Sequence, residues 1–232
     1  MEKKLNYPFA IAIDGPAASG KSSVGKKVAE KLGFVFLDTG IMYRAVTWKV
    51  LDQAIGVLDE NQVGKIAQNI DIKILKPSQD DGRMQDIFVD GEDVTWLLRS
   101  AIINKNVSQV SRYAMVREAM TNQQRVIGKS VDVVMAGRDI GTVVLPNAKV
   151  KIYLEASAEE RARRRFSEES KNGNSISYDE ILENVLMRDE IDSSRDIAPL
   201  KPADDAYIIN TDKKPIDQVV NEIMQVINEA NK

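Results

Sequence analysis

The residues with the clearest chemical potential form a glycine-rich loop near the start of the chain. Residues 15–22 read GPAASGKS and match the pattern G-x-x-x-x-G-K-[ST]. Glycine lets a backbone curve closely around an anion, and successive N–H groups at a helix start then bind phosphate oxygens. Lys21 would neutralise the β- and γ-phosphates of ATP, and Ser22 would contact Mg²⁺. The predicted ATP-binding residues are Gly15, Pro16, Ala17, Ala18, Ser19, Gly20, Lys21, Ser22 and Ser23.

The loop lies between two elements that such a phosphate site requires. Residues 9–13 are a continuous apolar run, typical of a strand buried on both faces. After the loop, Val24, Val28 and Leu32 recur every four residues and mark one face of a helix. The alternative is a structural turn with a solvated lysine. The strand and the helix together favour the phosphate-binding interpretation.

Charged residues also follow two later predicted strands. Arg44 comes soon after the run at 34–37, where it could bind an acceptor phosphate, with Tyr43 as a flat apolar contact. The alternative there is an ordinary helix start capped by Asp38 or Thr39. Arg138 and Asp139 follow the buried run at 131–136 and adjoin two glycines. Burying both charges is costly unless they face a ligand or each other, so a structural ion pair is the alternative.

Two further groups of arginines fall on predicted helices. Arg188, Asp192 and Arg195 are spaced by four and three, which predicts one helix face, with Ile181 and Val185 on the opposite face. That group fits a ligand site and a solvated ion-pair stripe equally well. The second group is Arg161, Arg163, Arg164 and Arg165, before a polar stretch at 171–177. It suggests a lid whose Arg161, paired with Arg164 or Arg165, covers a transferring phosphoryl group, although most charge runs are solvated.

The order of these elements predicts the fold class. Short apolar runs at 9–13, 34–37, 131–136, 150–154 and 206–209 are separated by helical patterns. This alternation is typical of an α/β fold with a five-stranded parallel sheet and helices on both faces. Residues 71–94 break the alternation and predict a small antiparallel insertion, with a turn at 90–93. Asp212 and Pro215 predict the start of the last helix, cap then proline.

Composition excludes several classes of chemistry. The 232-residue chain has no Cys and no His, which removes disulfides, thiol nucleophiles and histidine bases. Phosphoryl transfer remains possible because it relies on positioning and charge neutralisation. The net charge of −3 gives no global attraction for nucleic acid. No apolar run reaches membrane-spanning length, and the run at 9–13 is too short for a signal peptide, so we expect a cytoplasmic protein without membrane partners.

Several stretches together resemble the bacterial cytidylate kinases, part of the P-loop nucleoside monophosphate kinase superfamily. They cover the chain from near residue 9 to about residue 212 and read IDGPAASGKSS, LDTGIMYRAV, DGEDVTWLLRS, SQVSRYAMVREAM, AGRDIGTVV, VKIYLEASAEERARRR and RDEIDSSRDIAPLKPADDA. The resemblance implies a single kinase domain over 1–232, with a nucleoside-monophosphate-binding insert at 64–107 and an Arg-rich lid at 158–177. It further implies (d)CMP kinase activity with ATP and Mg²⁺, and a monomer.

The resemblance also implies a role for individual residues. Thr39, Tyr43, Arg44, Arg138 and Arg195 match acceptor-site positions, with the arginines mainly binding phosphate. Ser108, Arg117 and Asp139 match the cytosine-reading set, and Arg188 with Asp192 match the pair that contacts the sugar. The family often has Ser at the position of Thr39, and the threonine keeps the hydroxyl group. The expected catalytic residues are Lys21, Arg161, Arg164 and Arg165.

Other functions stay open at this stage. A related kinase acting on UMP, AMP or a non-nucleotide acid is the nearest alternative. A P-loop switch or regulatory ATPase is another, although the guanine motif N-K-x-D is missing and NTDK at 210–213 is only a scrambled version of it. Asp38 and Asp14 are both candidates for the carboxylate that supports the metal beside Ser22, and the alternative for Asp14 is that it caps the loop.

Overall fold

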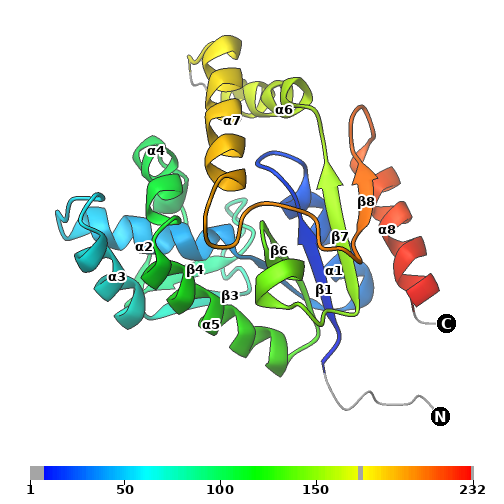
Figure 1. Ribbon diagram of the computed structural model, residues 1–232, viewed down its shortest axis with the longest axis horizontal. Helices are drawn as coiled ribbons and strands as arrows, with labels where there is room; N and C mark the ends of the chain where they lie inside the picture. Colours follow the sequence, from blue (N-terminus) through cyan, green and yellow to red (C-terminus); the bar gives the residue numbers. More distant parts are fainter. Residues whose placement is uncertain (1–7, 172–174, 231–232) are drawn as a thin grey trace. The chain divides into compact units, whose positions relative to one another are not determined.

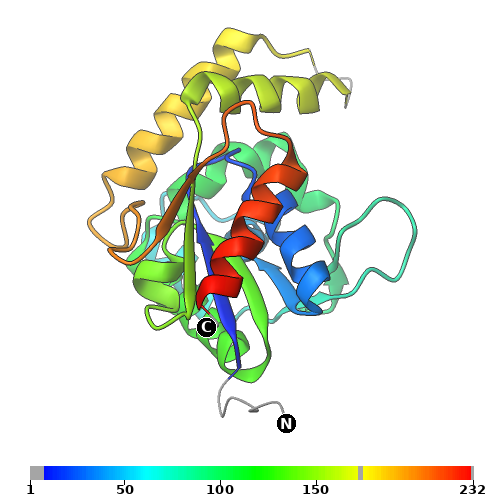
Figure 2. The ribbon, with the colours of Figure 1, turned by 90° about the vertical axis from the view of Figure 1, so that its right-hand side faces the viewer.

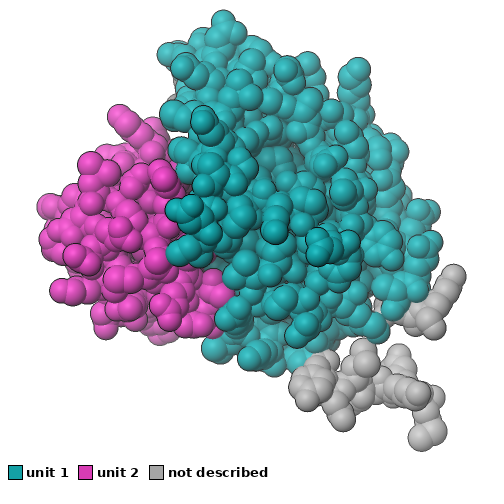
Figure 3. Space-filling model, viewed as in Figure 1, with its two compact units in different colours: residues 1–38, 124–232 teal, residues 39–123 magenta. Residues whose placement is uncertain are grey.

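The computed structural model describes residues 8–171 and 175–230 of the chain (Figure 1). The chain divides into two compact units, shown in Figure 3. Unit 1 comprises residues 1–38 and 124–232, and unit 2 comprises residues 39–123. Each unit has its own sheet, so each is described by itself.

Unit 1 is built on a five-stranded parallel sheet. Its strands, in the order β2-β6-β1-β7-β8, are Val35–Asp38, Val133–Gly137, Ala10–Asp14, Val150–Glu155 and Tyr207–Asn210. All five predicted strands exist, each within two residues of its expected bounds. Long crossovers join these strands, which is how parallel strands must be connected. The carboxyl ends of β1, β2 and β6 therefore lie at one edge, where Asp14, Asp38 and Gly137 end their strands.

The two faces of this sheet are covered differently. Helices α1 (Lys21–Leu32) and α8 (Ile216–Ala230) lie side by side on one face, as Figures 1 and 2 show. Ile11 and Ile13 of β1 join α1 and α8 in one buried core. Successive strand residues point to opposite faces, so Asp14 faces the other side. There it meets η2, a short π-helix over Ile140–Val144.

Two more helices of unit 1 pack against each other. Helix α6 spans Ala158–Lys171 and α7 spans Tyr178–Ser193. Ile181, Val185 and Asp192 are all buried, so they share one face of α7. The expectation that Ile181 and Val185 lie on the face opposite Asp192 is wrong. Val185 is four residues after Ile181 and Asp192 is seven residues after Val185, and both spacings place residues on the same side of a helix. Arg195 does not share the helix either, since α7 ends two residues before it.

Unit 2 combines helices with a three-stranded antiparallel sheet, as the sequence predicts for this insertion. Its elements are α2 (Gly40–Asp52), α3 (Glu60–Asn69), β3 (Ile72–Leu75), β4 (Asp86–Val89), β5 (Glu92–Asp93), η1 (Leu97–Arg99), α4 (Ala101–Val110) and most of α5 (Ala114–Ser130). The expectation of a turn throughout 90–93 is wrong, because β5 pairs with β4. The turn is shorter. Asp90 and Gly91 both have positive φ, as a two-residue hairpin turn requires.

A charged network anchors the long connection between β3 and β4. The guanidinium of Arg83 donates to Asp81 at 2.9 Å, to Asp86 at 2.9 Å and to Asp93 at 3.0 Å. Trp96 adds a bond from its Nε1 to Asp81 at 3.0 Å. Because the Arg83 side chain is almost fully buried, its partners compensate for lost hydration.

None of the helices in residues 8–171 and 175–230 has both the length and the apolarity to cross a membrane.

Helix α8 offers a direct test of this packing. Ile223 is fully buried in the core of unit 1, whereas Ile216 on the same helix is 42% exposed. Ile223→Ala should lower the free energy of unfolding by about 2–5 kcal/mol, through lost burial and a residual cavity. Ile216→Ala should change it by less than about 1 kcal/mol. Urea unfolding followed by circular dichroism measures both, and equal effects would contradict the packing described.

Candidate active site

The glycine-rich loop joins β1 to α1 in a form that only glycine permits. Gly15 has φ +147°, and a Cβ there would lie 2.3 Å from the backbone oxygen of Leu154. Gly20 has φ +98° and precedes the first turn of α1. The loop therefore brings backbone N–H groups and a helix N-terminus to one place, the arrangement that binds phosphate.

Lys21 lies folded over this loop. Its ammonium donates to the carbonyl of Pro16 at 2.5 Å and to the hydroxyl of Ser19 at 3.3 Å, and only 7% of the residue is exposed. Burial, and then the nearby charge of Arg138, lower the pKa of Lys21 well below its usual range. A phosphate bound at the loop would favour the protonated form again, because its charge is opposite.

The two carboxylates left open by the sequence have different partners. Asp38, at the end of β2, accepts a bond from the Ser22 hydroxyl at 2.5 Å. Asp14 instead accepts the backbone N–H groups of Ile140 at 2.8 Å and Gly141 at 2.7 Å. Only Asp38 therefore lies directly beside the loop hydroxyl. Asp14 supports the turn after β6.

That turn carries Arg138 and Asp139, and both side chains are sheltered from solvent. Arg138 donates from Nε to Asp192 at 2.8 Å, so its ion-pair partner is on α7 rather than at its neighbour. Burial opposes the charge of Arg138, but Asp192 and Asp38 hold its pKa above the usual value. Burial likewise opposes the charge of Asp192, and Arg138 with Arg195 nevertheless keep that pKa below its usual range.

Several predicted ligand residues thus gather in unit 1. Asp192 lies at the centre, with Arg138 on one oxygen and Arg195 at 3.5 Å from the other. Arg188 also acts on Asp192 electrostatically. The structure therefore brings together the predicted phosphate-binding and sugar-contacting residues of this unit, as a mutually compensated cluster.

The arginines of α6 separate into different roles. Arg161 is buried and makes a two-bond pair with Asp189 of α7, at 2.9 and 2.5 Å, and also reaches the Ala17 carbonyl of the loop at 3.3 Å. Arg164 donates to the Thr211 hydroxyl and carbonyl, at 3.1 and 2.6 Å. Arg163 pairs with Glu160 at the surface, and Arg165 lies 3.9 Å from Glu169. Arg161 and Arg164 are thus the pair nearest the loop.

Thr211 is a site residue that sequence reasoning missed. It is 2% exposed, and its hydroxyl lies 3.2 Å from the Ser19 carbonyl and 3.0 Å from the Glu155 carbonyl. With Arg164 it ties the end of β8 to the phosphate loop. A single threonine after a strand has no distinctive pattern, so no signal in the sequence marks it.

One further expectation, the cap on the last helix, is not met. Asp212 does not cap α8. Its carboxylate accepts the N–H of Ser157 at 2.9 Å and so stabilises the entry to α6. Lys151 of β7 and Asp205 form a further unexpected pair, with both carboxylate oxygens 2.8 Å from the ammonium.

Unit 2 holds the other predicted acceptor-site residues. Tyr43 and Arg117 come together, with the guanidinium 5.5 Å from the ring centroid. Arg44 donates to the carbonyl of Leu98 at 2.9 Å. Thr39 is buried just before α2, and Ser108 lies half-buried on α4.

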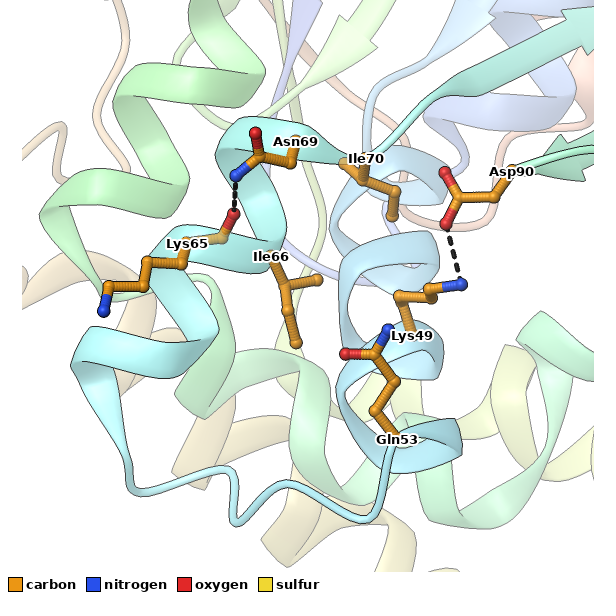
Figure 4. A pocket seen from close by; sticks show the side chains of 7 residues that line it. All are labelled: Lys49, Gln53, Lys65, Ile66, Asn69, Ile70 and Asp90. Atoms are coloured by element: carbon orange, nitrogen blue, oxygen red, sulfur yellow. Dashed lines mark hydrogen bonds and ion pairs between the residues drawn. The ribbon is translucent and has the colours of Figure 1, made fainter.

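A pocket of about 250 Å³ on unit 2 is unrelated to this chemistry. It is lined by Lys49, Gln53, Lys65, Ile66, Asn69, Ile70 and Asp90 (Figure 4). Lys49 is already paired with Asp90 at 2.7 Å, and the Lys65 side chain extends away from the others. None of the predicted ligand residues lines it, so it is not the candidate site.

The strand order, the glycine loop entering α1, and the cations around that loop define a class of protein, a P-loop kinase. The cytidylate kinase family model matches residues 11–229. The chain belongs to the cytidylate kinase family.

Individual relatives agree with this assignment. The chain is 47% identical to the cytidylate kinase of Herpetosiphon aurantiacus over 223 residues, which cover 96% of each chain. It is 43% identical to the cytidylate kinase of Bacillus subtilis over 232 residues, the whole of both chains. A solved structure of an uncharacterized protein from Eubacterium ventriosum aligns with a TM-score of 0.51 and 13% identity, over 95% of this chain and 98% of that one. That likeness concerns the fold alone.

The environment of Asp14 predicts how stability depends on pH. Burial raises its pKa from 3.8 to about 6, against the lowering effect of the Gly141 and Ile140 amides. A raised pKa means that the folded state favours the protonated carboxyl. This stabilisation is complete below pH 3.8 and is lost as pH rises through about 6.

We therefore expect the unfolding free energy of the wild type, relative to Asp14→Asn, to fall by about 2 kcal/mol between pH 4 and pH 7. Urea unfolding across this range measures the difference. Asp217→Asn is the control: its partner Lys27 lowers the pKa of Asp217, so the trend should have the opposite sign. If the difference in unfolding free energy between the wild type and Asp14→Asn did not change with pH, the buried environment assigned to Asp14 would be wrong.

Proposed function

We propose that this chain transfers the γ-phosphate of ATP to CMP or dCMP, giving ADP and CDP or dCDP. The observation that carries the proposal is that Lys21, which is buried, and Arg138, whose side chain is partly exposed, lie near each other beyond the carboxyl ends of β1 and β6. Two cations that repel each other are favourable where two phosphate groups must meet. Membership of the cytidylate kinase family supports the nature of the acceptor.

Lys21 binds the phosphates of ATP, whose chain lies along residues 15–23. An oxygen of the acceptor phosphate attacks the γ-phosphorus, and the bond from that phosphorus to the β–γ bridging oxygen breaks. ADP leaves with the electron pair. Near neutral pH the acceptor phosphate is already ionised, so the step needs no general base. That requirement matches a chain without histidine.

We assign acceptor binding to residues of both units. The phosphate-binding set is Thr39, Tyr43, Arg44, Arg138 and Arg195, the base-reading set is Ser108, Arg117 and Asp139, and the sugar pair is Arg188 with Asp192. In unit 1, Asp192 fixes the Arg138 guanidinium through Nε, which favours a defined orientation for phosphate binding.

Arg161, Arg164 and Arg165 complete the proposed catalytic set with Lys21. Arg161 acts from a fixed position, because Asp189 and the Ala17 carbonyl hold it against the loop. The lid that we propose spans 158–177, of which residues 172–174 lie outside the described part of the chain. The proposed insert spans 64–107.

The residues beside the loop fit Mg²⁺, which prefers oxygen ligands. Ser22 and Asp38 place a hydroxyl and a carboxylate together, and these two residues would hold the ion. Within the described residues, no group of three or more acidic side chains gathers as a metal cage. That suits an ion held by one or two protein ligands and the substrate phosphates. Bound Mg²⁺ would supply charge neutralisation at the phosphate oxygens.

We also propose that the protein is a cytoplasmic monomer that binds no nucleic acid. The net charge of −3 supports the absence of nucleic-acid binding, and the cytoplasmic supply of ATP supports the location. The monomer is an expectation that rests on the family alone.

Acceptor profiling tests the activity itself. ADP formation from Mg-ATP should be fast with CMP or dCMP, slow with UMP, and negligible with AMP or without an acceptor. Lys21→Ala should reduce turnover by about a hundredfold or more, because it removes the cation that stabilises the transferring phosphates. ADP formation that ignores the acceptor would instead indicate a regulatory ATPase.

The role of Asp139 has a separate test. Its buried carboxylate would accept a hydrogen bond from the exocyclic amine of cytosine, a group that uracil lacks. Asp139→Ala should reduce the ratio of kcat/KM for CMP to that for UMP by about ten- to hundredfold. Asp204→Ala, an exposed change in the same unit, is the control and should leave the ratio unaltered. An unchanged ratio in Asp139→Ala would remove Asp139 from the base-reading set.

A further inference from the structure

The turn that presents Arg138 and Asp139 leads directly into η2. This π-helix is closed by bonds from the Val144 N–H to the Asp139 carbonyl at 3.1 Å and from the Leu145 N–H to the Ile140 carbonyl at 2.7 Å. Such wide turns are rare and are not self-sustaining in isolation. The placement of Arg138 and Asp139 therefore depends on what holds η2.

The N-terminal end of η2 is capped from a distance. Asp139 occupies the N-cap position, where aspartate usually accepts an N–H of the first turn, yet it makes no such cap. Asp14 does so instead. Its two oxygens accept the N–H groups of Ile140 and Gly141, 126 and 127 residues further along the chain. The Asp139 carboxylate therefore takes no part in capping η2.

The C-terminal end of η2 has a matching cap of opposite charge. Arg125, on the part of α5 that belongs to unit 1, donates from Nη2 to the Val143 carbonyl at 2.7 Å and from Nε to the Val144 carbonyl at 3.1 Å. The negative carboxylate of Asp14 lies at the partially positive N-terminus of η2, and the positive guanidinium of Arg125 lies at its partially negative C-terminus. Both placements are electrostatically favourable. The rigid fork of arginine suits two adjacent carbonyls better than a lysine would.

The side of η2 is also closely packed. A Cβ added to Gly141 would lie 3.2 Å from Cδ of Lys151 and 3.3 Å from Oδ2 of Asp14. The Lys151 stem therefore lies against the turn, while its ammonium is held by Asp205. η2 has little room to shift while both caps are in place.

We propose that Asp14 and Arg125 are positioning residues that hold the acceptor-binding turn from its two ends. Neither contacts the acceptor. They replace the local cap of η2, so that the Asp139 carboxylate serves base selection and Arg138 keeps its orientation. This inference rests on the proposed function, because it concerns the turn that carries two of its acceptor residues.

Arg125→Lys is the most informative variant, because it keeps the charge but cannot span both carbonyls, and Arg125 is not part of the phosphate loop. We expect its KM for CMP to rise about tenfold and its preference for CMP over UMP to fall by a similar factor. The Kd for ATP, measured by isothermal titration calorimetry, should stay within about twofold of the wild-type value, because the loop is unaltered. Asp14→Asn, which replaces one accepting oxygen by a donor, should change the acceptor constants in the same direction.

Asp217→Asn serves as the surface control and should match the wild type in all constants, since the Asp217 carboxylate is exposed and pairs with Lys27 at the surface. Assays well below the unfolding temperature separate this role from a general loss of stability, which would not change the CMP to UMP ratio. The inference is overturned if Arg125→Lys keeps the wild-type ratio, or if it weakens ATP and CMP equally. If the wild type itself shows no preference for CMP, the proposed function fails, and that failure is seen without any variant.

Discussion

Repulsion between cations sheltered from solvent is the constraint on which the side chains around the phosphate loop depend. Lys21 is buried, and its burial, together with the nearby charge of the partly exposed Arg138, lowers its pKa. Arg195 adds another buried charge. Such an arrangement is unfavourable without counter-charges, because desolvated ions of one sign repel strongly. Asp38 and Asp192 provide this compensation, and each of them also makes a specific bond, to Ser22 and to Arg138 respectively.

The same constraint explains why these side chains come from separate elements. Asp38 ends β2, Arg138 follows β6, and Asp192 lies on α7. Parallel strands deliver such residues to one edge of the sheet, whereas one helix or loop could not supply this geometry. A ligand that carries two phosphate groups would take over part of the role of the aspartates.

Backbone geometry sets a second requirement, that the loops bearing these charges stay fixed. The phosphate loop is held by the Arg161 contact at Ala17 and by the Thr211 hydroxyl at Ser19. The turn after β6 is held through η2 by Asp14 and Arg125. Asp14 directly precedes Gly15, so the end of β1 supports both the phosphate loop and the turn that carries Arg138. Small displacements of β1 would therefore affect both parts together.

Local patterns in the sequence were enough to determine the phosphate loop, the five parallel strands and the antiparallel insertion, because strand runs, helix periods and glycine turns are properties of neighbouring residues. The stretches around Arg138 and Asp192 were also recognisable as family motifs. Their mutual pairing was not predictable, and neither were the caps that Asp14 and Arg125 place on η2. Those contacts join residues many positions apart, up to 127 for Asp14 with Gly141. Only the tertiary structure decided them, because chain crossovers and sheet order bring such residues together.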